Sequence, residues 1–147
     1  MKILKNVYHK IVFSVQSVPP ETGGILGGHN GIITIFYMDR GLPASIDQYI
    51  PDISCLNSVL SDWQDGGIEF YGMFHSHYPG IDELTVGDIV YINQIFQMMP
   101  LKVKSLYFPL IFPSDCMLSF KATREKSGIH IQKDSIQKIN SIVEEVL

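Results

Sequence analysis

The sequence predicts a mixed α+β fold, in which a mixed β-sheet is flanked by helices. Apolar residues recur at helical spacing in several separate segments, and short β-prone runs alternate with these segments. Glycine- and proline-rich turns divide the two kinds of segment. The chain has 147 residues and shows no repeat or linker, so we expect residues 1–147 to form a single domain with its own core.

Composition excludes several classes of protein. Hydrophobic residues make up 46% of the chain and charged residues 18%, which is typical of a compact globular protein. The net charge of -4 and the dispersed Lys and Arg residues argue against a nucleic-acid-binding surface. No stretch approaches 18 uninterrupted apolar residues, and the basic N-terminus lacks the apolar core of a signal peptide. We therefore expect a cytoplasmic protein without a nucleic-acid or membrane partner.

The two cysteines agree with that compartment. Cys55 and Cys116 lie far apart in the sequence, so they form neither a CxxC redox pair nor a cysteine zinc knuckle. Without a secretory signal, we expect two free and buried thiols.

The first third of the chain is expected to contain a helix and a β-hairpin. Residues 3–17 carry apolar side chains at three- and four-residue steps, which predicts an amphipathic helix that ends at a pair of prolines. The glycine-rich run 21–29 and the apolar run 32–37 are joined by Asn30-Gly31, the strongest short signal for a hairpin. A further short strand is expected over residues 45–50.

Two helices are expected on either side of the next strand. Pro51-Asp52 opens a helix that stops at Gly66-Gly67. A strand is predicted over residues 68–75. After a loop, the apolar stripe of residues 85–99 predicts a second helix.

The last third of the chain is expected to be β-structure followed by a helix. The predicted strands cover residues 105–111, 117–123 and 129–132. Pro109 and Pro113 cannot donate to a ladder, so the first of these strands is expected to be an edge strand or a bulged one. Residues 134–146 have apolar side chains at helical spacing and predict a C-terminal helix.

Possible metal ligands gather in one short stretch. His75 and His77, one residue apart in a strand, direct their side chains to the same face, and Asp88 opens the following helix. Each piece is weak alone, because a His-x-His pair is commonly an ordinary packed pair and Thr85-x-x-Asp88 is also a helix capping box. The two roles are compatible, since Thr85 can cap the helix while Asp88 turns a carboxylate oxygen toward an ion.

The joint pattern resembles a known family. His75-x-His77, then seven residues, then Thr85-x-x-Asp88, with Glu21-Thr22-Gly23-Gly24 upstream, is similar to the JAMM motif of the MPN-domain zinc metallopeptidases, especially their compact prokaryotic JAB-type members. The resemblance covers roughly residues 3–112. It implies a central mixed, partly barrel-like sheet flanked by helices, with a JAB/MPN-like and cytidine-deaminase-like topology.

The resemblance also implies a site. One zinc ion (Zn2+) per chain would be held by His75, His77 and Asp88, with a water in the fourth position. Glu21 would act as the general base and acid. Thr85 stands where the family usually has a serine whose hydroxyl helps to bind the oxyanion, so the extra methyl is the one departure from the motif. Ser76, between the ligands, is expected to face away from them and to support the site, with ordinary backbone packing as the alternative.

The implied activity is hydrolysis of a peptide or isopeptide bond in a protein or peptide substrate. The C-terminal tail of a ubiquitin-like or sulfur-carrier-like small protein is the expected substrate, bound beside residues 107–113 as an added strand. The alternative is a non-catalytic MPN-type binding or scaffold module, although such a module has no need for all three ligands and Glu21. A base deaminase would need His-x-Glu and Pro-Cys-x-x-Cys, which the sequence lacks. The sequence does not indicate the oligomeric state.

Overall fold

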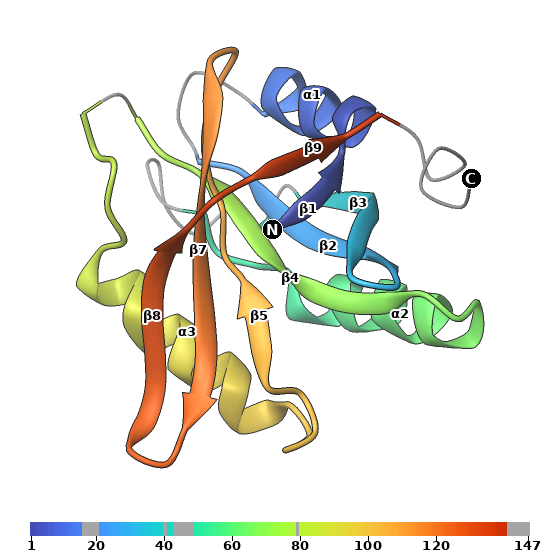
Figure 1. Ribbon diagram of the computed structural model, residues 1–147, viewed down its shortest axis with the longest axis vertical. Helices are drawn as coiled ribbons and strands as arrows, with labels where there is room; N and C mark the ends of the chain where they lie inside the picture. The colour runs from blue at the N-terminus through green and yellow to red at the C-terminus, as the bar shows by residue number, and fades with distance from the viewer. Residues whose placement is uncertain (16–20, 40, 43–48, 79, 141–147) are drawn as a thin grey trace.

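The structure, a computed structural model, describes residues 1–15, 21–39, 41–42, 49–78 and 80–140. Over these residues, nine strands form one mixed sheet and three helices flank it (Figure 1), which confirms the predicted fold class. The strands are β1 (Lys2–Leu4), β2 (Gly23–His29), β3 (Ile32–Asp39), β4 (Glu69–Ser76), β5 (Ser105–Tyr107), β6 (Leu110–Phe112), β7 (Cys116–Glu125), β8 (Gly128–Asp134) and β9 (Gln137–Ile139). The helices are α1 (Lys5–Ser14), α2 (Ile53–Asp65) and α3 (Val86–Met98). None of the described helices is long and apolar enough to cross a membrane.

The sheet has an antiparallel centre and parallel pairings on both sides. β2 lies between β3 and β4 and is antiparallel to both. β4 is parallel to β5 and β6, which are in turn antiparallel to β7, and β8 extends the sheet beyond β7. On the other side, β1 is parallel to both β3 and β9. This arrangement places β4, which carries the histidine pair, in the interior of the sheet.

β5 and β6 are two halves of one interrupted strand between β4 and β7. The expectation of an edge strand over residues 105–111 is therefore wrong, and only its alternative of an irregular strand fits. The expectation that a substrate tail adds as a strand beside residues 107–113 is also wrong, because β4 and β7 already pair with β5 and β6. Pro109 lies at the interruption and still accepts a hydrogen bond from the His75 amide through its carbonyl (3.3 Å), while Phe108 N–H bonds to the Phe120 carbonyl (2.8 Å). A proline is tolerated here because the ladder is broken at the position where its missing N–H would be needed.

Hydrophobic cores cover both faces of the sheet. Side chains alternate along β2 and β4, so Leu26 and Phe74 belong to the core under α1, whereas Ile25 and Met73 belong to the core shared with α2 and α3. The alternation continues to His75, which therefore lies on the face that α3 covers.

The hairpin and the two middle helices agree with the sequence prediction. Asn30 and Gly31 adopt φ angles of 52° and 80°, the left-handed pair that a two-residue type I′ turn between β2 and β3 requires. Asp52 caps α2 by accepting a hydrogen bond from the Cys55 amide (3.2 Å). Thr85 and Asp88 form a complete capping box at the start of α3, as their spacing predicts.

Both ends of the described chain differ from the prediction. Residues 2–4 form β1 rather than the first turn of a helix, and α1 begins at Lys5. The expected helix over residues 134–146 is wrong in its described part, because residues 137–139 form β9 beside β1; residues 141–147 lie outside the described chain. Most of the strand expected over residues 45–50 also lies outside the described residues.

Candidate metal centre

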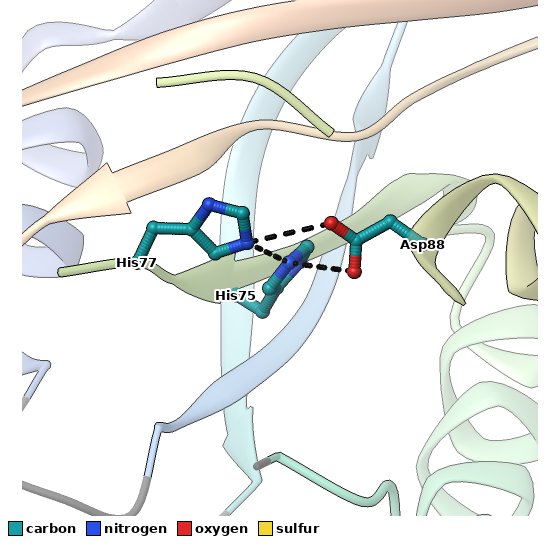
Figure 2. Close-up of side chains that lie close together, drawn as sticks. All are labelled: His75, His77 and Asp88. Carbon is teal, nitrogen blue, oxygen red and sulfur yellow. Dashed lines mark hydrogen bonds and ion pairs between the residues drawn. The ribbon is translucent and has the colours of Figure 1, made fainter. Parts of the chain in front are cut away.

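The three potential ligands come from two elements that face each other. His75 lies near the end of β4, His77 follows one residue after the strand, and Asp88 lies in the first turn of α3 (Figure 2). Strand alternation directs both imidazoles to the α3 side of the sheet. The capping box fixes where α3 begins and so brings the Asp88 carboxylate to the same point.

The ligand atoms converge on one position. His75 Nε2 and His77 Nε2 lie 2.9 Å apart. Asp88 presents one oxygen to each imidazole, with Oδ1 at 3.2 Å from His75 Nε2 and Oδ2 at 3.4 Å from His77 Nε2. One donor atom from each residue lies within 4.8 Å of the others, so these three residues can hold a metal ion.

The loop after β4 prepares His77 for coordination. His77 is 3% exposed, and its Nδ1 lies 3.0 Å from the Ile81 carbonyl oxygen. A carbonyl only accepts, so Nδ1 carries a proton, and Nε2 is the ring nitrogen that faces Asp88 and the position of a ligand. Fixing a histidine tautomer through the second ring nitrogen is how proteins commonly orient metal-binding imidazoles.

Electrostatics keep Asp88 ionised. Burial alone would raise the pKa of its carboxyl, but hydrogen bonds with His75 and His77 outweigh burial and hold the pKa well below its usual range. Burial would likewise lower the pKa of His77, yet the hydrogen bond with Asp88 and the Ile81 carbonyl raise it above its ordinary value. An anionic carboxylate beside two imidazoles attracts a cation.

Glu21 and Ser76 lie on opposite sides of the strands that carry the site. Glu21 lines the same pocket as the three ligands. The next residue, Thr22, exchanges two hydrogen bonds with Ser76: Thr22 N–H donates to Ser76 Oγ (2.9 Å), and Ser76 N–H donates to the Thr22 carbonyl (2.7 Å). Ser76 is 2% exposed and joins the segment of Glu21 to β4 from behind the pocket.

The pocket has a volume of about 460 Å³ and a largely apolar lining. Tyr49 lines the pocket, and its ring lies so near Gly23 that a side chain at this position would collide with it. The Tyr49 hydroxyl donates to the carboxylate of Asp39 (2.8 Å), which is buried at the end of β3. Burial and this hydrogen bond raise the pKa of Tyr49 well above its ordinary value.

No family model matches the chain, and no curated protein does. Among solved structures, the fold is similar to the solution structure of protein DSY2949 from Desulfitobacterium hafniense, with a TM-score of 0.65 over 95% of this chain and 94% of that one. The two sequences are 18% identical, so the likeness concerns the fold alone.

The other three histidines of the chain lie away from the metal ligands. His9, His29 and His130 are exposed on α1, β2 and β8. Cys55 and Cys116 are free, as expected, but both are half-buried rather than buried. Sequence reasoning missed Tyr49 and Tyr91 in the pocket. The position of Tyr91 three residues after Asp88 on the same helix could have indicated it, whereas no local pattern marks Tyr49.

Proposed function

We propose that this protein is a zinc-dependent metallopeptidase of the JAMM type that hydrolyses a peptide or isopeptide bond. The observation that carries the proposal is the convergence of His75, His77 and Asp88 in one pocket that Glu21 also lines. These are four of the five residues that the motif nominates, the fifth being Thr85, and they come from three separate segments of the chain.

The donor set suits zinc. Two imidazole nitrogens and one carboxylate oxygen are common zinc ligands, and a site with three protein ligands leaves a position open, as catalytic zinc sites do. A bound zinc ion would supply a Lewis acid and lower the pKa of water to about 7. His77, oriented by the Ile81 carbonyl, and Asp88, oriented by the capping box, would hold the ion together with His75.

The other polar groups of the site have distinct tasks. Glu21 takes a proton from the attacking water and returns it to the leaving amine as the scissile bond breaks. Thr85 Oγ1 accepts from the Asp88 amide (3.2 Å), which leaves the hydrogen of its hydroxyl to donate to the oxygen of the scissile carbonyl. The departure from serine to threonine thus keeps the donor that the reaction needs.

The surface beside the pocket supports a protein substrate. Ile81 lines the pocket and is 46% exposed, and Val86, Ile89 and Val90 at the start of α3 are 80%, 40% and 52% exposed. Val86, Ile89 and Val90 share one face of the helix by their spacing, and an exposed apolar face is typical of a protein-binding site. We therefore favour the C-terminal tail of a ubiquitin-like or sulfur-carrier-like small protein as substrate. The two free thiols support a reducing compartment such as the cytoplasm.

Metal analysis tests the site. Protein purified without a histidine tag should contain about one zinc per chain, and His77→Ala should lose it because two ligands hold the ion far more weakly than three. His29→Ala is the matched control, since His29 is exposed beside the hairpin turn and should leave the zinc content unchanged. A zinc content below about half an equivalent in the parent protein, or no loss in His77→Ala, contradicts the site.

A second variant separates the enzyme from a scaffold module. Glu21→Gln should keep the zinc and lose hydrolysis of a fusion in which the tail of a ubiquitin-like protein is joined to a fluorescent reporter, because Gln cannot take the proton. Turnover in Glu21→Gln at the parent's rate would remove Glu21 from the mechanism. A parent protein that binds zinc but cleaves neither this fusion nor its isopeptide-linked form would favour the scaffold role.

A further inference from the structure

We propose that the part of the pocket beside His75 is a specificity subsite that takes a large aliphatic side chain of the substrate, next to the bond that is cleaved. The inference rests on the proposed function and names the class of residue that its substrates carry at this position. Three elements of the fold form the subsite: β4, α3 and the segment of residues 49–51.

Two rows of side chains lead from the ligands into the subsite. On β4, Met73 lies two residues before His75 and points to the same face of the sheet. On α3, Tyr91 lies three residues after Asp88 and so occupies the same side of the helix. The rows converge, because the Tyr91 hydroxyl lies 3.8 Å from the Met73 sulfur. An apolar chamber therefore begins directly beside the metal ligands.

Asp39 fixes the segment of residues 49–51, which forms the third wall of the subsite. Its buried carboxylate accepts hydrogen bonds from the Tyr49 hydroxyl (2.8 Å), the Asp52 amide (3.0 Å) and the Gly41 amide (3.1 Å). The Ile50 carbonyl accepts a further bond from the Leu42 amide (2.8 Å). A wall fixed by several hydrogen bonds is formed before the substrate arrives, which reduces the entropy lost on binding.

The chamber suits an aliphatic side chain better than a small or charged one. Ile92 and Phe108 form its floor and are 2% and 4% exposed, whereas Tyr49, Ile50 and Tyr91 form half-buried walls. The charged residues among the described lining are Glu21 and Asp88, both at the metal end. A charged substrate side chain would lose its hydration without gaining a partner, and glycine would leave the walls uncovered. Burial of a leucine side chain should strengthen binding about 10- to 100-fold relative to glycine.

Peptide hydroxamates test the subsite through binding rather than turnover. Two pairs of hydroxamates carry either leucine or glycine next to the chelating group, one pair on the amino side of that group and the other on its carboxyl side. Calorimetric titration of the zinc-loaded protein should give an affinity at least about tenfold higher for leucine in one of the pairs. Leucine and glycine affinities within about twofold in both pairs would overturn the proposal.

A matched pair of variants locates the effect. Ile50→Asp places a charge in the wall and should abolish the leucine advantage while the affinity for the glycine hydroxamate stays within about twofold. Ile53→Asp makes the same change three residues later, at the exposed start of α2 and outside the pocket, and should keep the advantage. A leucine advantage that survives Ile50→Asp, or that both variants lose, contradicts a subsite at residues 49–51.

Parallel assays with two peptide substrates that differ only in this leucine or glycine separate the two proposals. Leucine-selective binding without hydrolysis supports the subsite and contradicts the peptidase. Hydrolysis without any leucine preference in rate or binding contradicts the subsite alone. If no hydroxamate binds to the protein, both proposals are wrong.

Discussion

Asp88 combines two tasks within a single carboxylate. Its Oδ2 accepts from the Thr85 amide (2.8 Å) and also faces His77, while Oδ1 faces His75. The capping role fixes the carboxylate's position without metal, so the ligand requires little rearrangement to bind an ion. Thr85 completes the arrangement, since its hydroxyl accepts from the Asp88 amide (3.2 Å).

Substitutions at Thr85 separate the cap from its extra methyl group. Thr85→Ser keeps the hydroxyl and should leave both the free energy of unfolding and the hydrolytic rate nearly unchanged. Thr85→Val keeps the shape but loses the cap, so the free energy of unfolding should fall by about 1 kcal/mol and hydrolysis should be lost. Urea unfolding of the metal-free protein and the reporter assay measure the two effects. Full activity in Thr85→Val would exclude Thr85 from the reaction.

Two buried hydroxyls behind the pocket should respond in opposite directions. Thr22 Oγ1 is buried and has no hydrogen-bond partner among the described residues, whereas Ser76 Oγ accepts the Thr22 amide. Thr22→Val should therefore raise the free energy of unfolding by about 1 kcal/mol, because a buried polar atom without a partner is removed. Ser76→Ala should lower it by about 2 kcal/mol, because the Thr22 N–H loses its acceptor. Urea unfolding of the two variants measures both changes in the free energy of unfolding. A loss of stability in Thr22→Val would contradict the inference that its hydroxyl has no hydrogen-bond partner.

At the scale of elements, α3 is held at both ends. The capping box closes its N-terminus at the metal ligands. At the other end, Arg124 reaches across from β7 and donates to the carbonyls of Phe96 (2.6 Å), Met99 (3.0 Å) and Val103 (2.8 Å). Its guanidinium also lies over the Phe96 ring, 5.1 Å from the centroid. One side chain thus satisfies carbonyls that the helix leaves open at its end.

Lysine cannot replace Arg124 in this role, because an ammonium has no planar fork of donors. Arg124→Lys should lower the free energy of unfolding by about 2 kcal/mol through the loss of charge-assisted hydrogen bonds. Lys126→Ala, in the exposed turn between β7 and β8, is the control and should change stability by less than about 0.5 kcal/mol. Chemical denaturation of the metal-free proteins provides the comparison. Equal stability of Arg124→Lys and the parent protein would mean that these carbonyls accept hydrogen bonds from water when the guanidinium is absent.

For the whole molecule, the sequence predicted what local chemistry determines. Asn30-Gly31 predicted its hairpin because the turn needs two left-handed residues, and Thr85-x-x-Asp88 predicted the start of α3 because its cap closes within one turn. Strand alternation likewise places His75 and His77 on one face, whereas Asp88 meets them through the packing of α3 against β4. The site could therefore be predicted almost completely at the level of its ligands.

Features that depend on distant pairing could not be predicted in this way. Ile136 and Ile139 have helical spacing, but Ile139 is buried where β9 lies beside β1, near the opposite end of the sequence. Three-residue strands carry too little pattern to indicate a partner so far away. The same limit applies to Tyr49, whose place in the pocket depends on the buried carboxylate of Asp39 rather than on any motif around it.

Zinc should stabilise the whole domain, because its ligands are together only in the folded chain. In the folded chain, the ligand atoms of His75, His77 and Asp88 lie within 4.8 Å of one another. The unfolded chain does not keep them together, so zinc binds the folded state preferentially. Free zinc at 100 times its dissociation constant should add about 2.7 kcal/mol to the free energy of unfolding. Urea unfolding with zinc and with a chelator measures this difference within each variant. Asp88→Ala should lose the stabilisation by zinc and Glu21→Gln should keep it, because of these two residues only Asp88 is a ligand. Equal stabilisation of Asp88→Ala and the parent protein would place the metal elsewhere in the chain.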